Sequence, residues 1–254
     1  MNPDYQILKQ DLQALGLQKG DSVLIHSSYR SMGGLEGGIQ TFVDAVMAVV
    51  GDTGTLIAPT LSFKYVTPDN PVFDYVNTPS CVGAISEYIR CMEGARRSIA
   101  PTHSCTCYGY KRDWYVEGHE KDNTTVGENS PFCKLREDGG KILMLGCGLK
   151  PNTSFHAIEE KFGCSFVFPE YLKPAPYTII LPDKTYEIDL YRNQIGVLGY
   201  RQRYDRVENV LDPKYMPKGT VHGAVSYLID APAMWDAALD TLKKDELYFV
   251  EKIG

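Results

Sequence analysis

The sequence has 254 residues, of which 43% are hydrophobic and 23% are charged, close to an average globular protein. A chain of this length buries enough apolar surface to fold without disulfides or a structural metal. Its 26 basic and 32 acidic residues give a net charge of −6, which argues against a nucleic-acid-binding protein, and no apolar run approaches the roughly 20 residues of a membrane-spanning helix.

The first 60 residues predict a helix followed by a strand–loop–helix–strand unit. Leucines recur at helical spacing over 8–15, and the apolar segment 22–26 predicts a buried strand. A glycine-containing loop follows over 27–38, apolar residues at helical spacing predict a helix over 39–50, and 55–59 predicts a second strand. This βαβ order predicts a largely parallel sheet.

The rest of the chain alternates loops with shorter elements. We expect a loop at 68–79, a helix over 82–92, a polar stretch over 113–130, a strand over 141–145, a short helix over 153–162, a hairpin over 174–189 with its turn at Pro182-Asp183, and helical structure from 223 onward, broken near Pro232. No repeat or change in composition divides the chain. We therefore expect residues 1–254 to form one α/β domain, with a central, mostly parallel sheet flanked by helices and an irregular or hairpin insertion.

Seven cysteines are scattered along the chain. Their number is odd and no two are spaced as Cys-x-x-Cys, so neither a disulfide framework nor a zinc site is expected. The first residues contain no basic and apolar signal segment. We expect a cytoplasmic protein with reduced thiols and no metal.

The loop after the first strand has the composition of an anion-binding bend. Hydroxyl groups at Ser27, Ser28 and Ser31 accompany Arg30, and several glycines would let backbone N–H groups approach an anion. The spacing matches neither the dinucleotide-binding nor the P-loop pattern. A tight polar connection that needs glycines only for its geometry is the alternative interpretation.

His156 is the best candidate for a general base, because histidine titrates near neutrality. Glu159 and Glu160 follow at i+3 and i+4, so both lie on the same face of a helix. Either carboxylate would hold one ring nitrogen and stabilise the protonated imidazole. A surface ion pair produces the same pattern, and a second histidine at zinc spacing is lacking.

Ser104 follows His103 in a turn around Pro101 and invites a comparison with serine nucleophiles. The nucleophile-elbow pattern Gly-x-Ser-x-Gly is absent, so covalent serine catalysis is not favoured. For His119 and His222 we expect surface or structural roles.

Six segments in this order resemble the antibiotic N-acetyltransferase family, typified by aminoglycoside 3-N-acetyltransferases. The segments are 23–33 (VLIHSSYRSMG) with Gly37 and Gly38, 54–60 (GTLIAPT), 78–87 (TPSCVGAISE), 97–104 (RSIAPTHS), 127–132 (GENSPF) and 152–159 (NTSFHAIE). They span most of the first 165 residues. The resemblance implies a compact α/β fold that uses acetyl-coenzyme A (acetyl-CoA) as donor and no metal.

The family pattern also implies a role for each segment. The residues implied to line the pyrophosphate and pantetheine of the coenzyme are His26, Ser27, Ser28, Tyr29, Arg30, Ser31, Met32 and Gly33. Those implied beside the acyl end are Thr60, Thr153 and Ser154, and His156 with Glu159 would be the catalytic pair. Hydroxyl or N–H donors near Thr60 or Ser104 would stabilise the oxyanion. Ala100 stands where family members often have histidine, so a role of that histidine is not carried over.

The acidic stretch 113–130 is the candidate binding segment for a cationic acceptor. Its acids are Asp113, Glu117, Glu120, Asp122 and Glu128, against the single base Lys121. An ordinary solvated loop explains this charge equally well.

We expect a monomeric or homodimeric enzyme that acetylates the 3-amino group of an aminoglycoside and so confers antibiotic resistance, without nucleic-acid or membrane partners. The alternatives are an N-acetyltransferase for an amino sugar or other metabolite, or a CoA-binding protein without catalysis.

Overall fold

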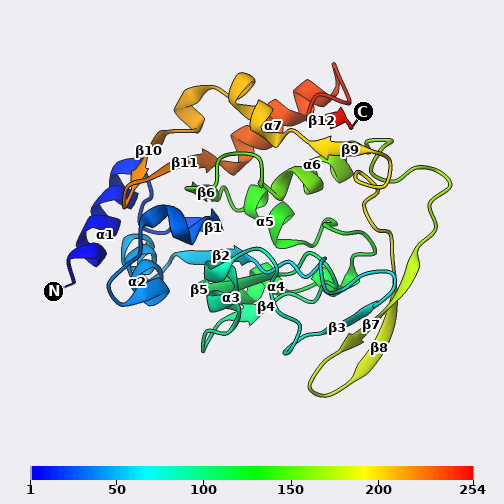
Figure 1. Ribbon diagram of the computed structural model, residues 1–254, viewed down its shortest axis with the longest axis horizontal. Helices are drawn as coiled ribbons and strands as arrows, with labels where there is room; N and C mark the ends of the chain where they lie inside the picture. The colour runs from blue at the N-terminus through cyan, green and yellow to red at the C-terminus, as the bar shows by residue number, and fades with distance from the viewer. Residues whose placement is uncertain (1, 254) are drawn as a thin grey trace.

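The computed structural model describes residues 2–253, which form a seven-stranded central sheet with helices on both faces (Figure 1). The strand order is β10-β11-β6-β1-β2-β5-β4. The bounds are β1 Ser22–Ser27, β2 Thr55–Pro59, β4 Arg96–Arg97, β5 Cys105–Gly109, β6 Lys141–Leu145, β10 Lys218–Val221 and β11 Ala224–Asp230.

The middle of the sheet is parallel and its flanks are antiparallel. β1 pairs in parallel with β2 and β6, whereas the outer strands on both sides pair antiparallel. A parallel neighbour needs a long crossover, but only His222 and Gly223 join β10 to β11. The expected α/β fold is confirmed, and its parallel part consists of the three central strands.

Two layers of helices cover the sheet. The helices are α1 Pro3–Leu15, α2 Gly38–Val50, α3 Ala84–Arg90, α4 Arg112–Val116, α5 Pro131–Glu137, α6 Ser154–Phe162 and α7 Ala231–Leu242, with 3-10 turns η1 Tyr29–Met32, η2 His119–Lys121, η3 Tyr204–Asn209 and η4 Pro213–Tyr215. Side chains of β1 alternate between the layers: Val23 and Ile25 pack with α1, α2 and α3, and Leu24 packs with α4 to α7. Among residues 2–253, no helix is long and apolar enough to cross a membrane.

Two smaller sheets complete the fold. β3 (Val72–Asp74) pairs with β7 (Ala175–Ile180), which forms the expected hairpin with β8 (Thr185–Leu190), and β9 (Tyr200–Gln202) pairs with β12 (Val250–Lys252). The β7–β8 hairpin extends from the end of the molecule opposite α1 (Figure 1). The prediction of an added hairpin is confirmed.

The prediction of a helix from residue 223, broken near Pro232, is wrong. Residues 224–230 form β11, which pairs with β6 inside the sheet, and α7 begins at Ala231. Pro232 occupies the first turn of α7, where the absent N–H has no helical partner to lose, and the Asp230 carboxylate accepts from Ala233 N at 2.9 Å. Pro232 therefore starts this helix.

His222 clamps the β10–β11 turn to the N-terminal helix. Its ring nitrogens lie 3.0 Å from Asp4 Oδ1 and 2.9 Å from the carbonyl oxygen of Met32, and its backbone N–H donates to Asp11 Oδ2 at 2.8 Å. A carbonyl oxygen and an ionised carboxylate only accept, so both ring nitrogens carry hydrogen when both bonds form. The hydrogen bond to Asp4 raises the pKa of His222.

Replacing His222 with asparagine, which also tolerates the φ of 47° found here, is expected to destabilise the fold more at about pH 6 than at about pH 9. Because the folded-state pKa is raised, the stabilisation is complete below the unfolded-state pKa of about 6.5 and is lost as the pH rises through the folded-state value. Urea unfolding of both proteins at the two pH values measures this. An equal difference in unfolding free energy at both would contradict the charged clamp.

Candidate active site

The site lies at the edge of the sheet where the parallel strands end. β1, β2 and β6 all run toward this edge, and ligands of open α/β sheets bind beyond the carboxyl ends of such strands. Two cavities lie there, of about 70 Å³ and about 620 Å³. Leu61 and Thr153 line the smaller one, and Phe63 and His156, two and three residues further on, line the larger one. The two cavities are therefore lined by nearby residues of the same two segments.

The smaller cavity brings together residues from β1 and from the start of α6. His26, Ser27 and Thr153 line it, and Thr153 N donates to His26 Nε2 at 3.4 Å. Burial lowers the pKa of His26 to about 3, so this ring is neutral. The hydroxyl of Ser154 is buried and has no hydrogen-bond partner among the described residues. These four predicted residues lie together.

The glycine-containing bend after β1 is formed but lies outside both cavities. Residues 29–32 form η1, and Ser31 Oγ donates to Ser28 O at 2.6 Å. Gly33 and Gly34 have φ values of 75° and 94°, and nothing within 4 Å fills the position where a Cβ would stand. Of the predicted coenzyme residues, those at 28–33 line neither cavity, although they follow directly on Ser27.

The predicted pair of His156 and Glu159 is present, and Tyr204 joins it. His156 Nδ1 lies 3.5 Å from Glu159 Oε2 and 3.1 Å from Tyr204 Oη, and Tyr204 Oη donates to the same carboxylate oxygen at 2.9 Å. Asn193 Nδ2 lies 3.3 Å from Nδ1, and its Oδ1 accepts from Ile195 N at 2.9 Å, which fixes the amide. Nδ1 is therefore enclosed by three side chains, while the His156 ring lines the cavity.

Burial sets the charge state of this network. Glu159 is fully buried, which raises the pKa of its carboxyl, and the hydrogen bond with His156 opposes that rise. Burial, reinforced by the Glu159 carboxylate, raises the pKa of Tyr204 well above its usual value, so its hydroxyl keeps the proton that it donates. The result is a hydrogen-bonded path from the buried Glu159 carboxyl group through Tyr204 to the His156 imidazole.

His103 lies beside His156 in the lining of the larger cavity. The two rings meet edge to face with centroids 5.6 Å apart, and Phe63 stacks on His103 at 6.0 Å. Burial first, and then the nearby charges of His156 and Arg192, lower the pKa of His103 well below its usual value. His103 is thus a neutral wall of the larger cavity.

Thr60 and Ser104, the expected oxyanion donors, lie in a buried network with Arg97. Ser104 Oγ accepts from Arg97 Nε at 2.8 Å and donates to the carbonyl of Thr60 at 2.9 Å. Thr60 Oγ1 lies 3.1 Å from the hydroxyl of Thr106. Neither residue lines the two cavities, so the structure does not bring these hydroxyls to His156.

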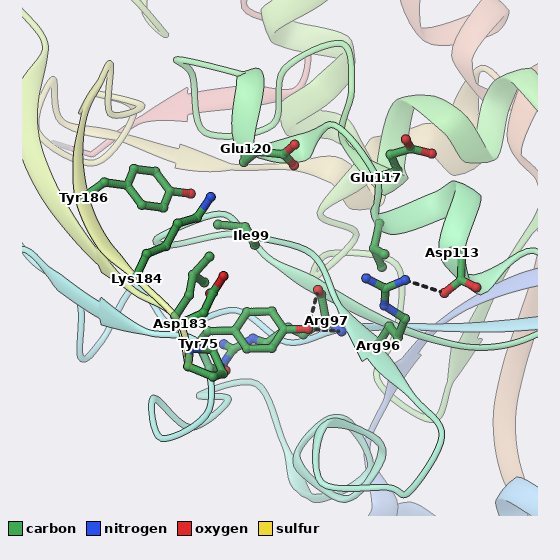
Figure 2. A pocket seen from close by; sticks show the side chains of 13 residues that line it. Tyr75, Arg96, Arg97, Ile99, Asp113, Glu117, Glu120, Asp183, Lys184 and Tyr186 are labelled. Atoms are coloured by element: carbon green, nitrogen blue, oxygen red, sulfur yellow. Dashed lines mark hydrogen bonds and ion pairs between the residues drawn. The ribbon is translucent and has the colours of Figure 1, made fainter.

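The structure also separates the acidic stretch from His156. Asp113, Glu117 and Glu120 line a different cavity of about 580 Å³ beside the β7–β8 hairpin, where Asp113 accepts from Arg96 at 2.9 Å (Figure 2). Asp122 and Glu128 line a further cavity of about 520 Å³. From the stretch 113–130, Thr125 alone lines the His156 cavity.

Residues 2–253 contain no cluster of three His, Cys, Asp or Glu side chains that could hold a metal ion.

Several residues of the site had no signal in the sequence. Tyr204 and Asn193 follow His156 by 48 and 37 positions, so no local spacing links them to it. Arg192 lies next to Asn193 in the same loop. His103 was noted in the sequence, but because it precedes Ser104 it suggested a serine nucleophile. In the structure it lines the His156 cavity.

Comparison with known proteins points to one family. A sequence profile of the family described as aminoglycoside 3-N-acetyltransferase matches residues 24–243. Aminoglycoside N(3)-acetyltransferase III of Salmonella sp is 33% identical over 169 residues, which are 60% of this chain and 58% of that protein. The aligned region therefore spans less than two thirds of that curated relative.

Solved structures share the fold over nearly the whole chain. A histidine-to-alanine mutant of aminoglycoside acetyltransferase AAC(3)-IVa in complex with a gentamicin has a TM-score of 0.82 and 26% identity, over 96% of this chain and 90% of that chain. AAC-IIIb in a binary complex with CoASH has a TM-score of 0.80 and 27% identity, over 94% and 96%. These likenesses confirm the predicted α/β fold and the resemblance found in the sequence.

Proposed function

Because the chain belongs to the aminoglycoside 3-N-acetyltransferase family, we propose that it transfers the acetyl group of acetyl-CoA to a primary amine bound in the His156 cavity. The acceptor that the family supports is the 3-amino group of an aminoglycoside. The observation that carries this proposal is the His156–Tyr204–Glu159 network on the wall of a cavity whose lining includes the same two segments that line the His26 cavity.

His156 is proposed to act as the general base. An alkyl amine is mostly protonated at neutral pH and must lose a proton to attack a thioester. In the tautomer in which Nδ1 carries a hydrogen and donates it to Tyr204 Oη, the ring keeps a lone pair on Nε2 for that proton, and the 3.3 Å approach of Asn193 Nδ2 to Nδ1 is then a contact and not a hydrogen bond. The neutral amine nitrogen then forms a bond to the acetyl carbon and the carbon–sulfur bond breaks. The second proton that the nitrogen loses neutralises the departing thiolate, so the products are the amide and the CoA thiol. Glu159 stabilises the imidazolium through Tyr204.

The smaller cavity is proposed to hold the pantetheine end of the coenzyme. His26, Ser27 and Thr153 surround it, and the bend with Gly33 and Gly34 has open space where backbone can meet a phosphate. The CoA complex of AAC-IIIb supports this coenzyme for the family. We further propose that residues 1–254 work as one acetyltransferase domain in the cytoplasm.

Acetyl transfer is tested by incubating the purified protein with acetyl-CoA and an amine and following release of the CoA thiol with a thiol reagent. Gentamicin and sisomicin are the first acceptors, because relatives have been solved with both. We expect thiol release that depends on the amine, with the N-acetylated product seen by mass spectrometry. If none of the amines tested supports thiol release, the proposal is contradicted.

A second acceptor class, amines that carry an acidic group and have no role in resistance, is favoured by one observation. The lining of the His156 cavity includes the cationic side chain of Arg192.

A further inference from the structure

The His156 cavity has an unexpected charge for a site that would hold a polycation. Arg192 is among its lining residues, whereas no Asp or Glu of residues 2–253 is. His103 is kept neutral by burial, and Glu159 lies behind His156 within the protein. Among the described residues, Arg192 is therefore the lining residue that brings a fixed charge to this cavity.

Arg192 is held in place by its neighbours while its own guanidinium stays unpaired. Tyr191 N donates to Asn123 O at 2.8 Å, Asn193 N donates to Thr125 Oγ1 at 3.2 Å, and Gln194 Nε2 donates to the carbonyl of Arg192 at 2.8 Å. The structure shows no hydrogen bond or ion pair of the guanidinium with any described residue. By contrast, Arg203 in the next segment pairs with Asp205 and Glu251.

An unpaired guanidinium on a cavity wall is a ready partner for an oxyanion. Its planar donors match a carboxylate or a phosphoryl group with two parallel hydrogen bonds. It also repels a cationic ligand, more strongly in a partly buried cavity than in water. Arg192 therefore distinguishes acceptors by charge.

We propose that this site has a preferred acceptor class of its own: primary amines that carry a carboxylate or phosphoryl group. This inference rests on the proposed acetyl transfer. Arg192 and His156 line the same cavity, and Asn193, next in the chain to Arg192, contacts the His156 ring, so one bound molecule can present an anion to Arg192 and an amine to His156. The reaction is unchanged: the amine gains the acetyl group, His156 takes one proton of the ammonium, and the second proton leaves with the CoA thiolate as the thiol.

Two matched pairs of acceptors test the preference. Glucosamine 6-phosphate is compared with glucosamine, and γ-aminobutyrate with butylamine, with sisomicin as a polycationic reference, all by CoA thiol release. We expect kcat/KM to be at least about tenfold higher for the member of one or both pairs that carries the anionic group than for its match without that group, the size of one charge-assisted hydrogen bond. The pair that shows the advantage identifies phosphoryl or carboxylate recognition. Added salt is expected to reduce it.

The variant Arg192→Gln tests whether this side chain is responsible. The ratio of kcat/KM within the preferred pair is expected to fall toward one, and a general loss of activity cancels in that ratio. Arg201→Gln is the matched control, because Arg201 is an exposed partner of Glu251, and it should keep the wild-type ratio.

The outcomes separate the two proposals. If no amine supports thiol release, the proposed acetyl transfer fails. If amines are acetylated but the members of both pairs with and without the anionic group react equally, or if Arg192→Gln leaves the ratio unchanged, only the charge preference is overturned.

Discussion

Replacing His156 with alanine is expected to lower kcat for acetyl transfer by about 10²–10⁴-fold while the affinity for acetyl-CoA stays close to that of the wild type. The imidazole is the proposed acceptor of the amine proton and lines the larger cavity, whereas His26 and Thr153 line the smaller cavity, which is proposed to hold the coenzyme. Steady-state kinetics gives the loss of kcat, and calorimetric titration gives the affinity. A variant that keeps wild-type kcat would remove His156 from the mechanism.

Two adjacent glutamates offer a matched control for the network. Glu159 reaches His156 and Tyr204, whereas Glu160 accepts from Val126 N and lines a different cavity. Glu159→Gln is expected to lower kcat by about tenfold or more, within the range of general-base effects. Glu160→Gln is expected to leave kcat nearly unchanged, because burial raises the pKa of Glu160 to about 8 and a neutral amide resembles the protonated acid. Equal losses in both variants would indicate a general effect on α6.

Replacing Arg97 with methionine is expected to destabilise the fold by roughly 3 kcal/mol, since it leaves several buried acceptors without donors. The guanidinium is buried and donates to Thr60 O at 2.9 Å, Thr78 O at 2.6 Å and Ser104 Oγ at 2.8 Å, and it stacks on Phe73 at 4.7 Å. Burial lowers the pKa of Arg97 to about 10, so it remains charged at neutral pH. For a chain of this size the melting temperature should fall by roughly 6–12 °C.

Arg96, the preceding residue of β4, provides the control for this substitution. Its side chain is about half exposed and pairs with Asp113 at 2.9 Å (Figure 2). Exposed ion pairs contribute less than about 1 kcal/mol, so Arg96→Met is expected to change the melting temperature by only a few degrees. Calorimetric scans of both variants measure the difference. Equal shifts would show that the network around Arg97 does not stabilise the fold as described.

Features with local causes could be predicted from the sequence. The strands at 55–59 and 141–145 match because each is a short apolar run that directly follows a glycine, and the β7–β8 turn follows from Pro182-Asp183. The contact between His156 and Glu159 was also predictable, because three positions along a helix bring two side chains to one face.

Features that depend on distant partners could not be predicted. β11 looked helical because its pairing with β6 is not visible in its own residues, and Pro232 is compatible with either the start or the break of a helix. The net charge of the acidic stretch does not indicate which cavity its side chains line. Tyr204 and Arg192 reach the site only through tertiary packing.

The structure of the complex with CoA tests the central claim most directly, namely that His156 acts where the coenzyme delivers its acetyl group. The predicted result places the sulfur between the two cavities, with Leu61–Phe63 on one side and Thr153–His156 on the other, and with the His156 ring facing it. A sulfur bound beside Arg96 and Asp113, or one that points into bulk solvent away from His156, would contradict it.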